Sequence, residues 1–77
     1  MNLVKIGNRI RFLRVNYIGL SQEEFAKFLG YDRAYLSRVE SGKQNLTVES
    51  LIKICYGLNI SLKDFFDFDK YDFHKQE

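Results

Sequence analysis

The stretch GYDRAYLSRVESG, residues 30–42, carries the side chains best suited to binding a partner molecule. Arg33 and Arg38 each present a planar fork of N–H donors, which suits paired hydrogen bonds to neighbouring acceptors. Tyr31 and Tyr35 add two hydroxyl groups at a spacing of four residues. The chemistry of this stretch is hydrogen bonding to an anionic or acceptor-rich surface. The same arginines could also form an ordinary solvated helix face, so their positions in the fold must decide between the two interpretations.

Residues for bond-making chemistry are scarce in this chain. It contains one cysteine, Cys55, and one histidine, His74. Neither a Cys/His nucleophile pair nor a set of zinc ligands is indicated. A single cysteine fits a reducing compartment, and we expect Cys55 to be a small core residue. The sequence predicts a non-enzymatic protein with no cofactor, no metal ion and no small-molecule ligand.

Charge is distributed unevenly along the 77 residues, which are enough for one domain. Residues 1–61 hold nine Lys/Arg and five Asp/Glu, a net of +4, whereas residues 62–77 hold three and five, a net of −2. A basic body with an acidic tail indicates an anionic partner for the body. Four basic residues interrupt the apolar N-terminal segment, so neither a signal peptide nor a membrane span is predicted. We expect a cytoplasmic protein.

The chain contains no proline, and residues typical of helix starts and helix ends recur along it. An apolar stripe predicts a first helix over about residues 3–17. Four further helices are expected to begin at N-capping residues; these are Ser21, Asp32, Thr47 and Ser61. SQEE has the pattern of a capping box, and SLKD is a weaker form of it. Gly19, Gly30, Gly42 and Gly57 are expected to mark helix ends. The predicted fold is all-α, with a core at about residues 4–66 and an aromatic, acidic tail at 67–77.

The expected buried faces follow the helical period. They are Leu3, Ile6, Ile10, Leu13 and Tyr17 in the first helix, Phe25, Ala26, Phe28 and Leu29 in the second, Leu36 and Val39 in the third, and Val48, Leu51, Ile52, Cys55 and Leu58 in the fourth. Lys5, Arg9 and Arg11 are expected to lie mostly off the first stripe. Glu40, near the end of the third helix, opposes the helix dipole and is expected to pair with Arg14 or Arg9.

The second and third helices are joined by only Gly30 and Tyr31. Such a short link makes the two helices cross steeply, as in the helix-turn-helix unit. Ala26 is small where the helices touch, and Gly30 is free to adopt a left-handed backbone at the turn. Leu36 and Val39 bury the third helix against the second. The sequence therefore predicts a helix-turn-helix unit.

The segment SQEEFAKFLGYDRAYLSRVESGKQNLTVESLIKICYGLNISLKDFF resembles the lambda-repressor-like, or Xre-type, helix-turn-helix family. Its short length and the stretch DRAYLSRVESGKQNLT look most like the controller proteins of restriction–modification systems. The resemblance implies a five-helix domain that binds double-stranded operator DNA as a homodimer and controls transcription. It also implies a groove-facing side of the third helix made of Asp32, Arg33, Ala34, Ser37 and Arg38. Phosphate or backbone contacts are implied for Gln22, Lys43, Gln44 and Asn45.

The residues support the same interface. Positions 33, 34, 37 and 38 lie on the side of a helix opposite Leu36 and Val39. The arginines suit guanine edges, and the alanine suits a thymine methyl group. The hydroxyls of Tyr31 and Tyr35 suit phosphate oxygens, although Tyr35 is equally suited to a half-buried core position. Asp32 is interpreted as the helix cap. A simple polar loop is the alternative for residues 43–45.

The C-terminal aromatics exceed what one small domain easily covers. Leu62, Phe65, Phe66 and Phe68 are therefore predicted to form a two-fold self-association surface, with Phe65 or Phe66 also completing the core. Part of residues 69–77 could instead be a disordered tail. A second hypothesis is a protein-interaction module of the same fold, such as an antitoxin or anti-repressor, in which this aromatic end holds a different protein.

Overall fold

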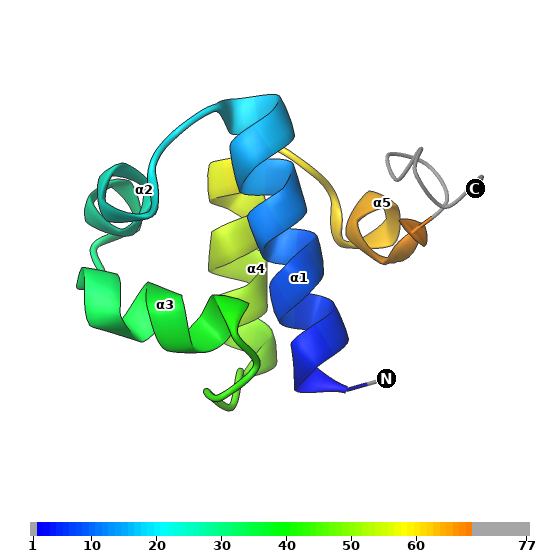
Figure 1. Ribbon diagram of the computed structural model, residues 1–77. Coiled ribbons are helices and arrows are strands. Elements are labelled where there is room, and N and C mark those ends of the chain that lie inside the picture. The colour runs from blue at the N-terminus through cyan, green and yellow to red at the C-terminus, as the bar shows by residue number, and fades with distance from the viewer. Residues whose placement is uncertain (1, 69–77) are drawn as a thin grey trace.

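The computed structural model describes residues 2–68, and every regular element among them is a helix. The elements are α1 (Leu3–Leu13), η1 (Arg14–Ile18), α2 (Gln22–Leu29), α3 (Arg33–Glu40), α4 (Val48–Leu58) and α5 (Leu62–Phe66). In Figure 1, α2 and α3 lie on one side of the molecule and α5 on the other, with α1 and α4 between them. The predicted all-α fold with five α-helices is confirmed. The predicted tail at residues 69–77 lies outside the described residues.

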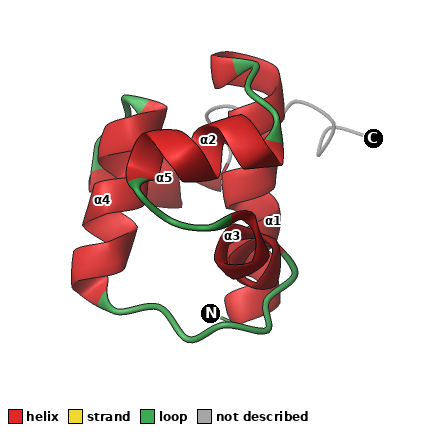
Figure 2. Cartoon of the chain, turned by 90° about the vertical axis from the view of Figure 1, so that its left-hand side faces the viewer, coloured by secondary structure: helices red, strands yellow, loops and turns green. Residues whose placement is uncertain are grey.

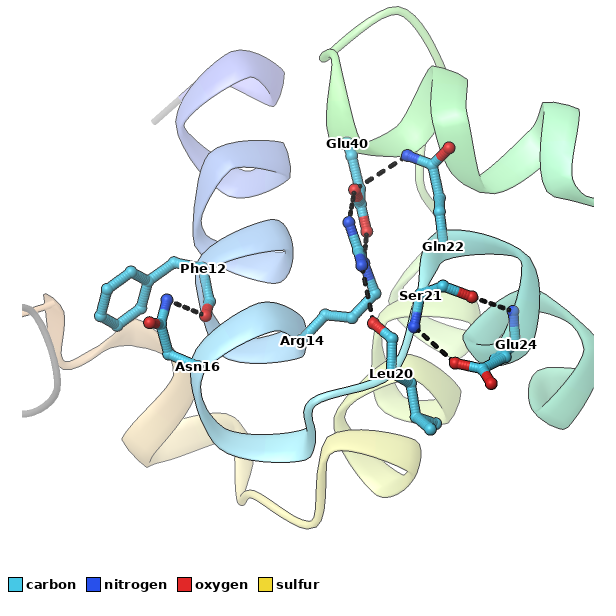
Figure 3. A network of polar contacts seen from close by, with 8 residues as sticks. All are labelled: Phe12, Arg14, Asn16, Leu20, Ser21, Gln22, Glu24 and Glu40. Carbon is cyan, nitrogen blue, oxygen red and sulfur yellow. Dashed lines mark hydrogen bonds and ion pairs between the residues drawn. The ribbon is translucent and has the colours of Figure 1, made fainter.

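Every predicted N-cap caps its helix. The side-chain oxygens of Ser21, Asp32, Thr47 and Ser61 each accept a hydrogen bond from the backbone N–H three residues later. At Ser21 the capping box is complete, because the Glu24 carboxylate also accepts from the Ser21 N–H at 2.8 Å (Figure 3). The hydrogen bonds from the Ser21 backbone and hydroxyl lower the pKa of Glu24. The local sequence thus sets where α2 to α5 begin.

The first helix differs from the prediction in its last part. The α-helix ends at Leu13, and the chain continues as a wider π-helical turn, η1, up to Gly19 with φ +73°. Within this turn the Asn16 side-chain amide donates a hydrogen bond to the Phe12 carbonyl at 2.8 Å. This bond gives a partner to a carbonyl group at the point where the α-helix passes into the π-helical turn. The wider turn leaves Arg14 buried and Tyr17 47% exposed, so Tyr17 does not continue the core stripe.

The core is drawn from all five α-helices. Its most deeply buried side chains are Ile10, Phe25, Leu36, Val39, Ile54 and Phe65. Cys55 is buried among them, as predicted, and burial raises the pKa of its thiol to about 11. At neutral pH this cysteine is therefore a neutral, apolar side chain.

Several predicted core residues face outward instead. Phe28 of α2 is 64% exposed, and on α4 Val48 and Ile52 are 71% and 49% exposed. Ile54, which was not predicted, is fully buried in their place. The α4 sequence is apolar on more than one side, so the helical period alone could not choose which stripe packs inward. Gly57 lies inside α4 rather than at its end, and the helix ends at Leu58 with Asn59 in the left-handed conformation.

Gly7 allows α1 to cross the end of α3 at very close range. A β-carbon built at this position would collide with the backbone carbonyls of Val39 and Glu40, the last two residues of α3. We therefore predict that Gly7→Ala lowers the free energy of unfolding by about 1–3 kcal/mol, because two backbones would have to separate. Chemical denaturation followed by circular dichroism measures this. Asn8→Ala, at an exposed neighbour on the same helix, is the control. A stabilised Gly7→Ala variant, as helix propensity alone predicts, would contradict the close crossing.

Within residues 2–68, no helix combines the length and the apolar character needed to cross a membrane.

Candidate nucleic-acid interface

The turn between α2 and α3 has the geometry that the sequence predicted. Gly30 adopts the left-handed conformation with φ +82°, and the Tyr31 N–H donates back to the Ala26 carbonyl at 2.9 Å. Ala26 is buried between the elements, and α3 begins at Arg33. The helix-turn-helix unit is thus α2 followed by α3, and Figure 2 shows the loop that leads from one helix to the other.

The inner and outer faces of α3 divide as expected. Leu36 and Val39 are buried, and α3 packs against both α1 and α2. Asp32 caps the helix, with one carboxylate oxygen accepting from the Tyr35 N–H at 2.7 Å. Glu40 is also buried and Tyr35 is half-buried, whereas four side chains are exposed to solvent; these are Arg33, Ala34, Ser37 and Arg38. Of the five residues predicted to face the groove, these four therefore share the exposed face of α3, and the fifth, Asp32, is exposed at its N-cap.

A buried polar network fixes α3 relative to η1 and α2 (Figure 3). Arg14 and Glu40 form a two-pronged ion pair, with Nε to Oε2 at 2.7 Å and Nη2 to Oε1 at 2.9 Å. The Arg14 Nη1 group also donates to the Leu20 carbonyl at 2.8 Å. Of the two predicted partners for Glu40, Arg14 is therefore the correct one. Since both side chains are almost fully buried, this pair locks the end of α3 to η1.

Gln22, the predicted phosphate contact, belongs to the same network. Its Nε2 group donates to Glu40 Oε1 at 3.0 Å, while the side chain stays partly exposed at the first position of α2. A side-chain amide has a second N–H on the same nitrogen. Glu40 thus orients this amide and leaves one donor for an anion at the N-terminus of α2, where backbone N–H groups also favour anions.

The two tyrosines form a pair beside the turn. The rings of Tyr31 and Tyr35 lie 4.6 Å apart, and both residues are partly buried against the core. Lys53 of α4 lies over the Tyr31 ring at 4.6 Å, and the Arg38 guanidinium lies 5.9 Å from the Tyr35 ring. Lys53 is not among the residues that the sequence predicts for the interface. Its contact joins residues 22 positions apart, and no local spacing signals such a pair.

The loop after α3 is held tightly at its start. Gly42 has φ +78°, and the Lys43 N–H donates to the Arg38 carbonyl at 2.8 Å. Lys43 and Asn45 are exposed, whereas Gln44 is partly buried. The Gln44 amide oxygen accepts from Arg38 Nε at 3.0 Å. The loop therefore brings Gln44 against the outer face of α3 and leaves Lys43 and Asn45 exposed on either side of it in sequence.

The aromatic end of the chain corrects one prediction. Phe65 was predicted in the self-association surface, but its side chain is fully buried in the core and offers no surface to a partner. Phe66 is 40% exposed, and Leu62 and Phe68 are partly exposed. Phe65 is buried because α5 packs across α4 and is held from α1 by Arg9.

Arg9 is buried, with only 4% of its surface exposed, although it was expected to lie mostly off the buried stripe of the first helix. Its guanidinium donates to backbone carbonyls at the end of α5, at 2.8 Å to Phe65, 3.1 Å to Asp64 and 2.8 Å to Asp67. A cation at this position satisfies carbonyls that a helix end leaves without partners. The same guanidinium lies 5.1 Å from the Phe68 ring.

Comparison with known proteins identifies this architecture. The family model described as Helix-turn-helix (HTH_3) matches residues 10–65, which span α2, α3, α4 and most of the other helical residues. The chain belongs to the Xre-type helix-turn-helix family. The matched residues include the whole of the α2–α3 unit described above.

Relatives within the helix-turn-helix family include control proteins. The chain is 44% identical over 68 residues to the control protein C.MunI of a Mycoplasma species, covering 86% of this chain and 92% of the relative. The crystal structure of the restriction–modification controller protein C.AhdI from Aeromonas hydrophila matches with a TM-score of 0.76 and 41% identity, covering 83% and 91% of the two chains. The controller protein C.Esp1396I, as a tetramer in complex with its natural 35-base-pair operator, matches with a TM-score of 0.77 and 36% identity over 86% of each chain.

Proposed function

We propose that this protein is a sequence-specific transcriptional regulator that binds operator DNA as a homodimer, and that it acts in the cytoplasm as the controller of a restriction–modification system. The observation that carries the proposal is the exposed face of α3, made of Arg33, Ala34, Ser37 and Arg38, on a helix that is locked in place by buried contacts. The likeness to control proteins, one of them solved on its operator, supports it.

In this proposal α3 enters the major groove. Arg33 and Arg38 donate to guanine O6 and N7, and Ala34 contacts a thymine methyl group. Ser37 donates or accepts at the groove floor, and Asp32 can accept from a cytosine amine with the carboxylate oxygen that does not cap the helix. These contacts distinguish base pairs, because the major groove displays a different donor and acceptor pattern for each pair.

The groups around α3 hold the phosphate backbone. Gln22 and the N-terminus of α2 contact one strand, and Lys43 and Asn45 contact the other wall of the groove. Tyr31 and Tyr35 have their rings fixed against each other and against cations, which leaves the hydroxyl groups as phosphate donors. Such contacts set the position and affinity of the complex without choosing a sequence.

Self-association is assigned to the exposed aromatic surface of Leu62, Phe66 and Phe68, with Phe65 behind it in the core. α5 lies on the side of the molecule away from α2 and α3 (Figure 1), so a partner there would leave both recognition helices accessible. A two-fold dimer would place two α3 helices in successive major grooves about 34 Å apart and read a pseudo-palindrome.

Two substitutions test the division between base and phosphate contacts. Arg38→Ala is expected to reduce discrimination between the best site and its single-base variants by about 5- to 150-fold, the equivalent of about 1–3 kcal/mol. Lys43→Ala is expected to weaken binding to all sequences by the same factor and to reduce the slope of log K against log salt by about one. Fluorescence anisotropy on labelled duplexes measures both effects.

Unchanged affinity and unchanged discrimination in both variants at moderate salt would refute the proposed interface. If the protein instead co-purifies from its host with a stoichiometric second protein and shows no preference among duplexes, the protein-interaction hypothesis replaces this one.

A further inference from the structure

The guanidinium of Arg38 is held from two sides, although its residue is exposed. Its Nε–H donates to the amide oxygen of Gln44 at 3.0 Å, and its Cζ lies 5.9 Å from the centre of the Tyr35 ring. The two terminal Nη groups make no hydrogen bond to any of residues 2–68. An arginine with one edge occupied and its tip unoccupied has a restricted set of orientations before any ligand arrives.

The backbone around Gln44 is fixed firmly enough to act as a support. The turn at Gly42 closes through the Lys43 N–H and the Arg38 carbonyl, 2.8 Å apart. Gly42 also lies against α1, where a β-carbon would come within 2.6 Å of the Val4 Cα. The Gln44 amide nitrogen then donates to the Asn45 carbonyl at 3.5 Å. Since arginine Nε can only donate, this arrangement requires the amide oxygen to face Arg38.

This arrangement decides how Arg38 can approach a base. A guanidinium can present two N–H groups either from its side, with Nε and one Nη, or from its tip, with both Nη groups. Gln44 occupies the Nε–H, so only the tip remains for a paired hydrogen bond to two acceptors such as guanine O6 and N7. Without Gln44, the side chain regains rotamers and can also turn toward phosphates.

We propose that Gln44 is a positioning residue that determines the base specificity of Arg38, rather than a phosphate contact in its own right. The inference rests on the proposed DNA-binding function and adds a specificity role for a loop residue outside α3. In this arrangement the base preference of Arg38 depends on a hydrogen-bond acceptor in the side chain at position 44. It does not depend on the overall charge of the loop.

Three substitutions at position 44 separate the two roles. Gln44→Ala removes the acceptor, Gln44→Glu keeps an acceptor but adds a negative charge, and Gln44→Lys removes the acceptor but adds a positive charge. Arg38→Ala first identifies the base pair that Arg38 reads. For each protein variant, two dissociation constants are then measured, one for the best duplex and one for the same duplex with that base pair changed. The melting temperature of each protein variant is measured as well. Lys43→Ala is the matched loop control.

The positioning role predicts that Gln44→Ala and Gln44→Lys reduce discrimination at the Arg38 base pair by about three- to fivefold, as expected when an ordered side chain regains its rotamers. It predicts that Gln44→Glu keeps the discrimination while lowering affinity for both duplexes, and that Gln44→Ala has no further effect on discrimination in an Arg38→Ala background. Melting temperatures should stay close to wild type, because the contact is at the surface.

A phosphate role predicts the reverse pattern. Gln44→Ala would then weaken both duplexes equally, and Gln44→Lys would strengthen both without loss of discrimination; either result overturns the positioning role. A wild-type protein that binds duplex DNA without any base preference would refute the proposed function itself, and with it this inference. The two failures are thus distinguished by the wild-type measurement.

Discussion

Replacing Glu40 with leucine is expected to lower the free energy of unfolding by about 3–5 kcal/mol, because the buried guanidinium of Arg14 would lose its counter-charge. Both side chains are nearly inaccessible, at 8% and 3% exposure, so water cannot substitute for the carboxylate. A domain of 77 residues has about 4–12 kcal/mol of stability in total, so this loss is a large fraction of what holds the domain folded. Urea denaturation followed by circular dichroism measures the loss.

The double variant Arg14→Met/Glu40→Leu is the control. Removing both charges leaves no unpaired ion in the core, and apolar replacements of buried ion pairs are often neutral or stabilising. The double variant should therefore be more stable than Glu40→Leu alone. A loss below about 1 kcal/mol in the single variant, or a double variant as unstable as the sum of both singles, would contradict a buried, mutually dependent pair.

Phe65→Ala is expected to cost about 3–5 kcal/mol of folding stability, as large-to-small changes of buried aromatics do. The ring is fully buried, and its loss would leave a cavity between α4 and α5. Its neighbour Phe66, whose ring lies 5.1 Å away, is 40% exposed and provides the matched comparison. Thermal and chemical denaturation at a single low protein concentration measures both variants.

Phe66→Ala should cost less than about 1 kcal/mol of folding stability, since much of its surface already meets water. In the proposed self-association surface it should instead shift the monomer–dimer equilibrium, which sedimentation equilibrium measures. Equal destabilisation by the two substitutions would show that the core and surface roles of these phenylalanines are wrongly divided. A Phe66→Ala variant with unchanged self-association would remove Phe66 from the interface.

Local signals predicted much of the fold because they act over three or four residues. Ser21, Asp32, Thr47 and Ser61 cap their helices as expected, since each needs only its own hydroxyl or carboxylate and the following turn. The helix-turn-helix unit was predictable for a similar reason. Its glycine turn and its buried positions lie within a single short stretch of sequence.

Tertiary contacts account for what the sequence did not reveal. Arg9 is buried because it meets the carbonyls of α5, more than 50 residues away, and an arginine in an amphipathic pattern normally indicates the polar side. Packing against other helices also accounts for the π-helical turn after Leu13. The same kind of contact determines that Ile54, and not Ile52, is buried in the core. A helical period cannot distinguish two adjacent apolar stripes.

The candidate site shows the same division. The groove-facing positions on α3 followed from the spacing of Leu36 and Val39, whereas the contacts that support them did not. Two contacts join different elements: Lys53 lies over the Tyr31 ring, and Gln44 accepts a hydrogen bond from Arg38. Only the folded chain brings these side chains together. Sequence spacing thus predicted which residues would contact a partner, and the structure adds the residues that contact those side chains from other elements.

Selection of binding sites from random duplex DNA tests the central claim most directly. The full chain is incubated with a library, and bound duplexes are recovered over several rounds at moderate salt and sequenced. The proposed function predicts enrichment of a pseudo-palindromic motif whose half-sites are centred about one helical turn apart, with a base pair in each half-site that loses its preference in the Arg38→Ala variant. A library that remains unenriched after these rounds, or an enriched motif that Arg38→Ala leaves unchanged, would contradict the assignment of α3 as the base-reading helix.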